Sequence, residues 1–277
     1  WRSLCPDLVT TAGRWGDPVT RRQLEVLLSF AGPIAVLALW ELLSRTALID
    51  PRFWPPPSSL FDTLWEQAKS GALWTNVRIS MTRVFVGFLI AAVPGVMLGL
   101  AMGLYWPLRV FLMPVATALY AIPKLAVLPL TIIVFGVTEQ AKLAIVVVSI
   151  FFLIVLNTMA GVQAIDPVYL DVARNMGANR WRMFTSVALP GALPAIMTGF
   201  RLSLGFALLV IVGAEFLDGN KREPNGIGWY IIRSWQLFQI DDLFVGLLVV
   251  GLLAWILNAV LDLVERQVLP WRPNAGQ

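Results

Sequence analysis

Histidine is absent from the 277-residue sequence, and cysteine occurs once, at Cys5. Without histidine, no imidazole can act as a catalytic base, and a single cysteine cannot form a disulfide framework. Zinc sites built from these two residue types are excluded for the same reason. We therefore expect no bound metal and no histidine-dependent chemistry. Charged residues are also scarce, at 14% of the chain.

Apolar residues, in contrast, are abundant. Hydrophobic side chains make up 58% of the sequence and the mean hydropathy is +0.74, which is far more apolar than an ordinary soluble domain. The net charge of +4 comes from scattered arginines and lysines at the flanks of apolar runs, without a dense basic cluster. This pattern favours a lipid bilayer over a nucleic acid as the partner. The composition predicts an all-α, polytopic membrane protein.

Six apolar runs reach about 20 residues, the length that crosses the hydrocarbon core at about 1.5 Å per residue. They divide the chain into a cytoplasmic N-terminal segment (1–25), a transmembrane domain (26–264) and a cytoplasmic tail (265–277). The first run is too long for a signal-peptide core, so we expect it to remain as an anchor. A slight excess of arginine and lysine on one side favours both termini in the cytoplasm. The predicted spans are Val26–Arg45, Val84–Leu104, Leu108–Val137, Ala141–Gly161, Gly199–Leu217 and Leu243–Val264.

The third predicted span contains Pro114, Pro123 and Pro129, each of which removes a backbone donor and bends or breaks a helix. Lys124 is the one cation expected near mid-membrane. It is either a functional group or a lysine that reaches toward an interface, and the sequence leaves both open. For Glu215, late in the fifth span, the interfacial position is favoured. The candidate substrate-pathway residues are Lys124, Pro123, Tyr120 and Asn157.

Small residues recur at every fourth position of the second predicted span. Such a stripe lets another helix approach closely in lipid, either within the chain or in a dimer, and packing within the chain is favoured. The stripe consists of Gly87, Ala91, Gly95, Gly99 and Gly103.

The segment 162–198 is too polar for lipid and contains the start and stop signals of two short helices. Asp166 and Pro167 are typical of a helix start, and Gly177 is placed where a helix would end in the left-handed conformation. A second helix is predicted to start near Asn179 and to stop before Pro190. A rigid helix, turn and helix at the membrane surface is typical of a docking element.

Within this segment, the run Asp171-Val172-Ala173, then Gly177, then residues 187–190 (Val-Ala-Leu-Pro) follow a known pattern. They resemble the signature of permease subunits of ATP-binding-cassette importers, in which Glu-Ala-Ala is followed by Gly and Ile-x-Leu-Pro at these spacings. Asp171 keeps the charge of the family's Glu, while Val172 adds bulk in place of Ala. Residues 53–57, 121–130, 135–139 and 156–162 are similar to the nitrate, sulfonate and taurine branch.

The resemblance implies a type I importer permease fold with about six transmembrane helices in a bacterial inner membrane. It implies that 162–198 is a cytoplasmic coupling segment that contacts a separate ATPase. The chain has no Gly-rich phosphate loop ending in Lys-Ser or Lys-Thr, so ATP and magnesium are expected on that partner. The residues assigned to coupling by resemblance are Asp171, Val172, Ala173, Arg174, Gly177, Ala178, Arg180, Leu189 and Pro190.

The implied assembly contains two ATPase subunits, a second copy of the permease and a periplasmic or lipid-anchored substrate-binding protein. The implied solute is a small anion. A channel or an ion-coupled secondary transporter is the alternative, and it predicts inverted repeats or a network of buried acids, neither of which is evident in the sequence. A membrane-bound enzyme is a third alternative, against which the absence of a nucleophile and base pair argues.

Overall fold

The computed structural model describes residues 18–218 and 223–270, and within 18–30 it describes the side-chain surroundings of Leu28 alone. Every regular element in these residues is a helix, which confirms the predicted all-α class. The chain divides into two compact units, residues 1–62 and 63–277.

The first unit contains α1 (Pro18–Arg45) and the start of α2 (Pro57–Lys69). The Glu41 carboxylate, near the end of α1, accepts hydrogen bonds from the backbone N–H of Ser58 (3.0 Å) and from its hydroxyl (2.9 Å). A side chain of α1 thus satisfies an unpaired donor at the start of α2. The first predicted span, Val26–Arg45, lies within α1, although the placement of residues 1–17 falls outside the described residues.

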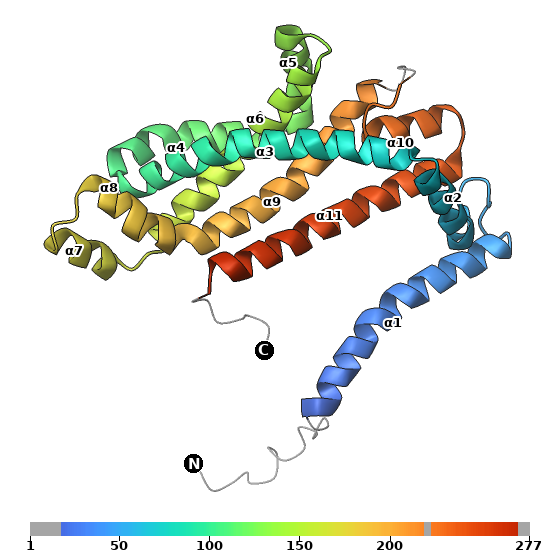
Figure 1. Ribbon diagram of the computed structural model, residues 1–277, viewed down its shortest axis with the longest axis horizontal. Coiled ribbons are helices and arrows are strands. Elements are labelled where there is room, and N and C mark those ends of the chain that lie inside the picture. The colour runs from blue at the N-terminus through green and yellow to red at the C-terminus, as the bar shows by residue number, and fades with distance from the viewer. Residues whose placement is uncertain (1–17, 219–222, 271–277) are drawn as a thin grey trace, which may run out of the picture. The chain divides into compact units, whose positions relative to one another are not determined.

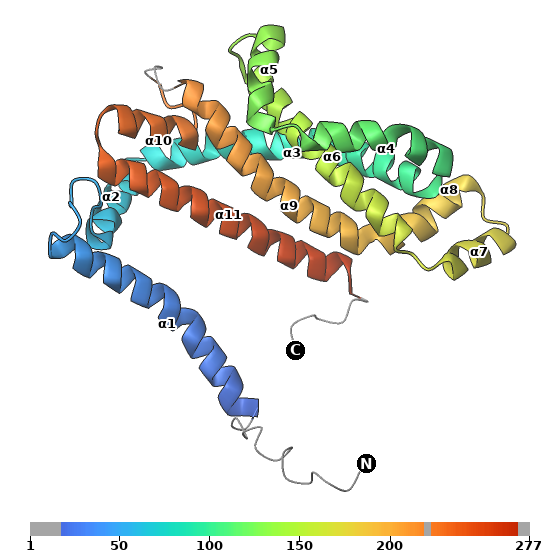
Figure 2. The same ribbon diagram turned by 180° about the vertical axis from the view of Figure 1, so that it is seen from behind.

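In the second unit, α3 (Ala72–Leu104), α6 (Glu139–Gln163) and α9 (Leu189–Glu215) pack against one another, and α11 (Ile240–Val268) lies beside α9 (Figures 1 and 2). Their shared core is formed by fully buried aliphatic side chains. Examples are Val84 on α3, Ile150 and Ile154 on α6, and Leu208 and Ile211 on α9.

The stripe of small residues on α3 faces α6. A Cβ atom added at Gly99 would lie 2.6 Å from Cβ of Thr158, and one added at Gly103 would lie 2.4 Å from Cβ of Val162. Only glycine permits the two backbones to come this close. The expected helix interface is therefore confirmed, and it lies within the chain.

Among the described residues, four helices are long and apolar enough to cross a membrane, and a fifth span results if the broken pair Trp106–Ala121 and Lys124–Phe135 is counted as one. Four of the predicted spans, the second and the fourth to sixth, match these long helices, and the third matches the broken pair. The count of six stays a prediction. The long helices are Ala72–Leu104, Glu139–Gln163, Arg180–Asp218 and Ile240–Val268.

The break in the third predicted span occurs at Pro123. There α4 (Trp106–Ala121) gives way to a short 3-10 helix, η1 (Lys124–Val127), and then to α5 (Leu128–Phe135), with a bend of 94° between the two parts. Pro114 lies inside α4 without ending it, and Pro129 occupies the first turn of α5, where its missing donor is not needed.

The prediction that a helix ends before Pro190 is wrong. After α7 (Pro167–Asn175) and α8 (Arg180–Arg182), the chain passes through a π-helical stretch, η2 (Met183–Ala188), directly into α9. The backbone N–H of Leu189 donates to the carbonyl of Phe184, five residues back. Such a wide turn lets the chain continue into a proline-containing first turn of α9 without a break. The remaining elements are η3 (Phe216–Asp218) and α10 (Ile227–Gln236).

Candidate functional site

The short helix α7 has both ends fixed by its own sequence. At its start, the Asp166 carboxylate accepts a hydrogen bond from the backbone N–H of Val168 at 2.9 Å. Beyond its end, Gly177 has φ +76°, the left-handed conformation predicted for it. The Asn179 side chain then caps α8 by accepting from the backbone N–H of Arg182 at 2.8 Å. The helix, turn and helix expected here is present as a defined structure.

No residue of α7 is buried. Met176 just after it is 82% exposed and Trp181 in α8 is 68% exposed. Asp171 and Arg174 form an exposed ion pair of 2.9 Å. Figures 1 and 2 show α7 and α8 at the opposite end of the second unit from α10.

The nine residues assigned to coupling by resemblance lie in α7, in the turn after it and in the helices that follow. Asp171, Val172 and Arg174 are exposed on α7, whereas Leu189 is half-buried at the start of α9 and packs on the core formed by Leu100 and Val162. In the rest of the set, Ala173 and Ala178 are half-buried, and Gly177, Arg180 and Pro190 are exposed.

A second feature is a cavity of about 330 Å³ at the break between α4 and η1. It brings together Tyr120, Pro123 and Lys124, three of the four candidate pathway residues. The fourth, Asn157, is not among its lining residues; its amide donates to the carbonyl of Leu153 at 2.8 Å. The cavity is lined by Tyr120, Ala121, Ile122, Pro123, Lys124, Ser149, Leu153 and Phe206.

Lys124 is only 6% exposed. Its ammonium group donates to the backbone carbonyls of Leu119 and Tyr120, at the end of α4. These carbonyls lack helical partners because Pro123 ends the helix, and their partial negative charge attracts a cation. Within the part of the chain that the structure describes, no carboxylate forms an ion pair with Lys124. Lys124 is thus a buried cation balanced by carbonyl dipoles instead of an acid.

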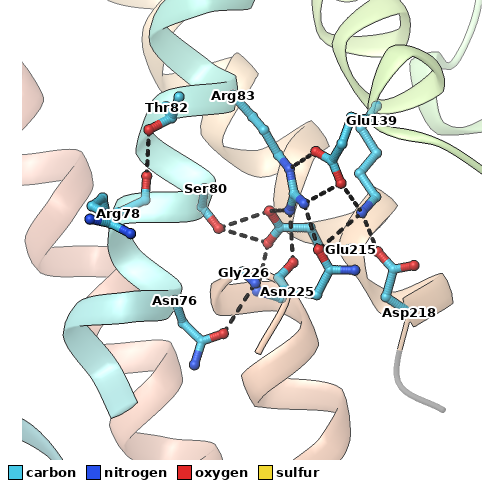
Figure 3. A network of polar contacts seen from close by, with 12 residues as sticks. Asn76, Arg78, Ser80, Thr82, Arg83, Glu139, Glu215, Asp218, Asn225 and Gly226 are labelled. Atoms are coloured by element: carbon cyan, nitrogen blue, oxygen red, sulfur yellow. Dashed lines mark hydrogen bonds and ion pairs between the residues drawn. The ribbon is translucent and has the colours of Figure 1, made fainter. Parts of the chain in front are cut away.

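The third feature, which the sequence analysis missed, is a network of buried charges at the end of the unit near α10 (Figure 3). Arg83 of α3 lies between two carboxylates, with Nη1 2.6 Å from Glu215 of α9 and Nε 2.6 Å from Glu139 of α6. Lys142 of α6 forms ion pairs with Glu139 (3.2 Å) and with Asp218 of η3. Three long helices are therefore joined by ionic contacts.

Glu215 is fully buried among other helices of the chain, at the centre of this network. Its position at the membrane interface stays a prediction. Its carboxylate accepts hydrogen bonds from Arg83, from the Ser80 hydroxyl (2.8 Å) and from the backbone N–H of Gly228 (2.9 Å). A Cβ atom at Gly226, where φ is +114°, would lie 2.2 Å from the carboxyl carbon of Glu215. This glycine lets the chain fold directly over the buried acid.

The two cations of the network both lie within long helices. Arg83 lies well inside α3, because that helix starts at Ala72 and not at Val84. Lys142 lies in the first turns of α6. The only signal in the sequence was the presence of a charge at the edge of each apolar run, since the partners of Arg83 are distant along the chain.

Comparison with known proteins identifies the class to which these features belong. Residues 95–272 match the family of binding-protein-dependent transport system inner membrane components. The chain belongs to this family. This permease is therefore a transport component of an ATP-binding-cassette importer and an inner-membrane protein.

Several curated relatives cover almost the whole permease. It is 30% identical to the taurine transport system permease protein TauC of Escherichia coli K12, over 93% of each chain. It is 31% identical to a putative aliphatic sulfonates transport permease protein SsuC of Bacillus subtilis 168, over 87% of this chain and 86% of that one. The nitrate import permease protein NrtB of Leptolyngbya laminosa is 29% identical over 90% and 89%.

Among solved structures, the permease resembles a chain of the MetNI methionine ABC transporter in inward-facing conformations. The TM-score is 0.59 at 18% identity, with 71% of this chain and 96% of that chain covered. This likeness supports the ABC importer permease fold.

Proposed function

We propose that this permease forms the path of a small oxyanion-bearing solute and couples it to a separate ATPase through α7. The observation that carries the proposal is the exposure of a structured helix. A helix of nine residues with no buried side chain adds little to the hydrophobic core of the permease. Its direction is nevertheless defined by its capped start and by the left-handed glycine that follows its end. Such an element is suited to contact another chain.

The chemistry of the exposed face supports a protein partner. Val168, Val172 and Met176 are spaced four residues apart, so they form one stripe, and they are 61%, 49% and 82% exposed. Asp171 and Arg174 lie close to this stripe and add polar groups. An apolar stripe with charged neighbours fits a groove on another protein. The partner is the ATPase, which binds ATP and magnesium.

The family supports an assembly of the permease with an ATPase and a substrate-binding protein, and we propose its composition. It contains two ATPase subunits, two copies of this permease and a periplasmic or lipid-anchored binding protein. In this arrangement α7 and both termini are cytoplasmic, and the network near α10 lies toward the outside. Residues 1–17 and 271–277, which include the chain ends, fall outside the described residues.

The solute class rests on the named relatives and on the cavity. The relatives are named for taurine, aliphatic sulfonates and nitrate, which all carry an oxyanion group. The cavity beside Lys124 has a volume of about 330 Å³, in the lower part of the range for small-molecule sites. A buried cation without an ion-paired acid in the described residues is suited to attract such a group.

Buried acids were the feature expected of an ion-coupled secondary transporter, and Glu215 and Asp218 are buried acids. Each is ion-paired with a cation, however, and the family membership is that of an ATP-driven importer. The acids therefore do not favour ion coupling.

Retention of the ATPase on a tagged permease tests the proposed coupling. Met176→Asp places a charge on the most exposed residue of the proposed contact stripe, so the ATPase should be lost on purification. Phe238→Asp is the matched control, because Phe238 is also 82% exposed but lies between α10 and α11. Equal retention of the ATPase by both variants would refute docking through α7.

A further inference from the structure

The five ionisable members of the network differ in their exposure. The side chains of Arg83 and Lys142 are 6% exposed and those of Glu215 and Asp218 are fully buried, whereas that of Glu139 is 58% exposed. The four buried groups form two ion pairs without Glu139 and carry no net charge as a set. Glu139 is a third acid, added from the exposed side.

The contacts of Arg83 show which interactions remain when its ion pair with Glu139 is broken. Nε and Nη2 donate to the two oxygens of Glu139, at 2.6 and 2.7 Å. Nη1 donates to Glu215 and to the carbonyl of Asn225, and Nη2 also donates to the Asn225 side chain. Arg83 keeps an ion pair and two further hydrogen bonds without Glu139. The outer bridge therefore opens without leaving a buried charge unpaired, which would be far more costly.

Glu139 is placed at the corner between α5 and α6. It is the first residue of α6, and the preceding Thr138 does not cap the helix, since its hydroxyl donates to the carbonyl of Phe135. Gly136 has φ +72°, which sets the turn of the corner. The bridge to Arg83 is thus the contact that ties this uncapped corner to α3.

The helix α5, which leads into this corner, packs against the rest of the unit along only one side. In Figure 1 it stands away from the long helices of the unit. Ile133 and Val134 are 79% and 72% exposed, while Leu128 and Ile132 pack on α6 and α9 through Ile145 and Val210. At its other end α5 continues from η1, which contains Lys124.

We propose that the Glu139–Arg83 bridge is a releasable catch that holds the α5–α6 corner and regulates access to the Lys124 cavity. This inference rests on the proposed function, since it treats the cavity as part of the solute path. The mechanical link is short: η1 and α5 connect Lys124 to the corner, and Ser149 and Leu153 of α6 line the same cavity. When the bridge opens, the four buried groups keep α3, the body of α6 and α9 together while the corner moves.

Cysteine labelling tests the catch. Cys5 is the only cysteine, so Cys5→Ser provides a clean background, in which Ala121→Cys places one thiol in the cavity wall. The permease with its ATPase is reconstituted in nanodiscs and labelled with a charged, membrane-impermeant methanethiosulfonate. Glu139→Ala should raise the labelling rate roughly two- to fivefold, the shift expected for a half-exposed ion pair. Glu223→Gln, which removes an exposed acid close in sequence to Asn225, is the matched control and should leave the rate unchanged.

The salt dependence of labelling distinguishes a contact that opens to regulate access from one that only stabilises the fold. A half-exposed ion pair is screened by salt, so raising the salt concentration should speed labelling more in the parent than in Glu139→Ala, in which only the encounter of the charged reagent with the cavity depends on salt. Equal labelling rates for Glu139→Ala and the parent would overturn the catch. So would a fall in the melting temperature of Glu139→Ala as large as that of Glu215→Gln, because it would show that the bridge holds the fold together. If the parent complex neither imports nor hydrolyses ATP, the proposed function itself fails.

Discussion

Single charged residues in the second unit are neutralised in two ways. Lys124 is held by backbone carbonyls at the end of α4, whereas Arg83 and Lys142 are paired with carboxylates. Removal of Glu215 or Asp218, the two buried acids, leaves a buried cation short of a partner, which is destabilising. Removal of the Lys124 charge leaves only helix-end carbonyls that border a cavity. A change in transport is therefore easier to interpret at Lys124 than at Arg83.

Lys124→Met keeps the length of the side chain and removes its charge. If Lys124 supplies a countercharge worth at least about 1.4 kcal/mol to the passing anion, uptake should fall by about tenfold or more while the complex still assembles. Uptake of taurine, an alkanesulfonate and nitrate into proteoliposomes measures this. Lys69→Met is the control, since Lys69 lies at the end of α2 with its ammonium over the Trp65 ring. Unchanged uptake in Lys124→Met would show that Lys124 only caps α4.

At the residue scale, the sequence identified Lys124 as unusual but did not predict the ionic contacts of Glu215 and Arg83. Lys124 was recognisable because its charge lies beside a proline inside an apolar run. The environment of Glu215 depends on Ser80 and Arg83, which are more than 130 residues away along the chain. Local hydropathy does not report contacts of that range. The buried ionic surroundings of an acid at the edge of a span are therefore not visible in the local sequence.

Whole helices depend on close contact between backbones, most clearly where α3 meets α6. A leucine at Gly99 would place Cβ 2.6 Å from Cβ of Thr158 and 2.7 Å from the carbonyl oxygen of Val155. Gly99→Leu should therefore force the helices apart, destabilise the permease by about 1–3 kcal/mol or more, and lower the yield of folded protein. Gly251→Leu in α11 is the control, because nothing lies within 4 Å of its added Cβ. Thermal unfolding in detergent compares the two, and equal melting temperatures would contradict the packing described.

The direction of α7 depends on Gly177, whose left-handed backbone costs a residue with a Cβ about 1–2 kcal/mol. Gly177→Val should fray or redirect the end of α7, so that solute-stimulated ATP hydrolysis falls while the membrane helices stay folded. Gly71→Val is a closely matched control: Gly71 has φ +78°, and, as at Gly177, nothing lies within 4 Å of the added Cβ. Both variants carry similar strain, but Gly71 precedes α3. Equal loss of stimulated hydrolysis in both would show that strain alone, and not the position in α7, is responsible.

Most elements were predictable because their signals are local. The apolar runs located the long helices, and Asp166, Gly177 and Asn179 marked the ends of the short ones correctly. The prediction that a helix ends before Pro190 was wrong because proline usually terminates a helix. Here a π-helical stretch before Pro190 lets the helix continue. Such a stretch has no sequence signal of its own. Pro123, with the same residue type, does end a helix.

At the scale of the second unit, the three features lie in separate places. The exposed α7 and the charged network lie at opposite ends, and the Lys124 cavity is connected to the network through α5 and α6. The family could be predicted because its motifs are short and local in the sequence. The network was not predicted, and of the cavity only Tyr120, Pro123 and Lys124 were candidates, because both features are assembled from residues of several helices that meet only in the folded chain.

Coupling through α7 is tested most directly by reversing the charge of Asp171 in the reconstituted importer. Asp171 is exposed and its ion pair is with Arg174 on the same helix, so Asp171→Lys should leave the membrane helices folded. Glu66→Lys, an exposed acid on α2, is the control. We predict that Asp171→Lys loses uptake and the solute-stimulated part of ATP hydrolysis, while Glu66→Lys keeps both. Full uptake with full stimulated hydrolysis in Asp171→Lys would contradict the proposed coupling.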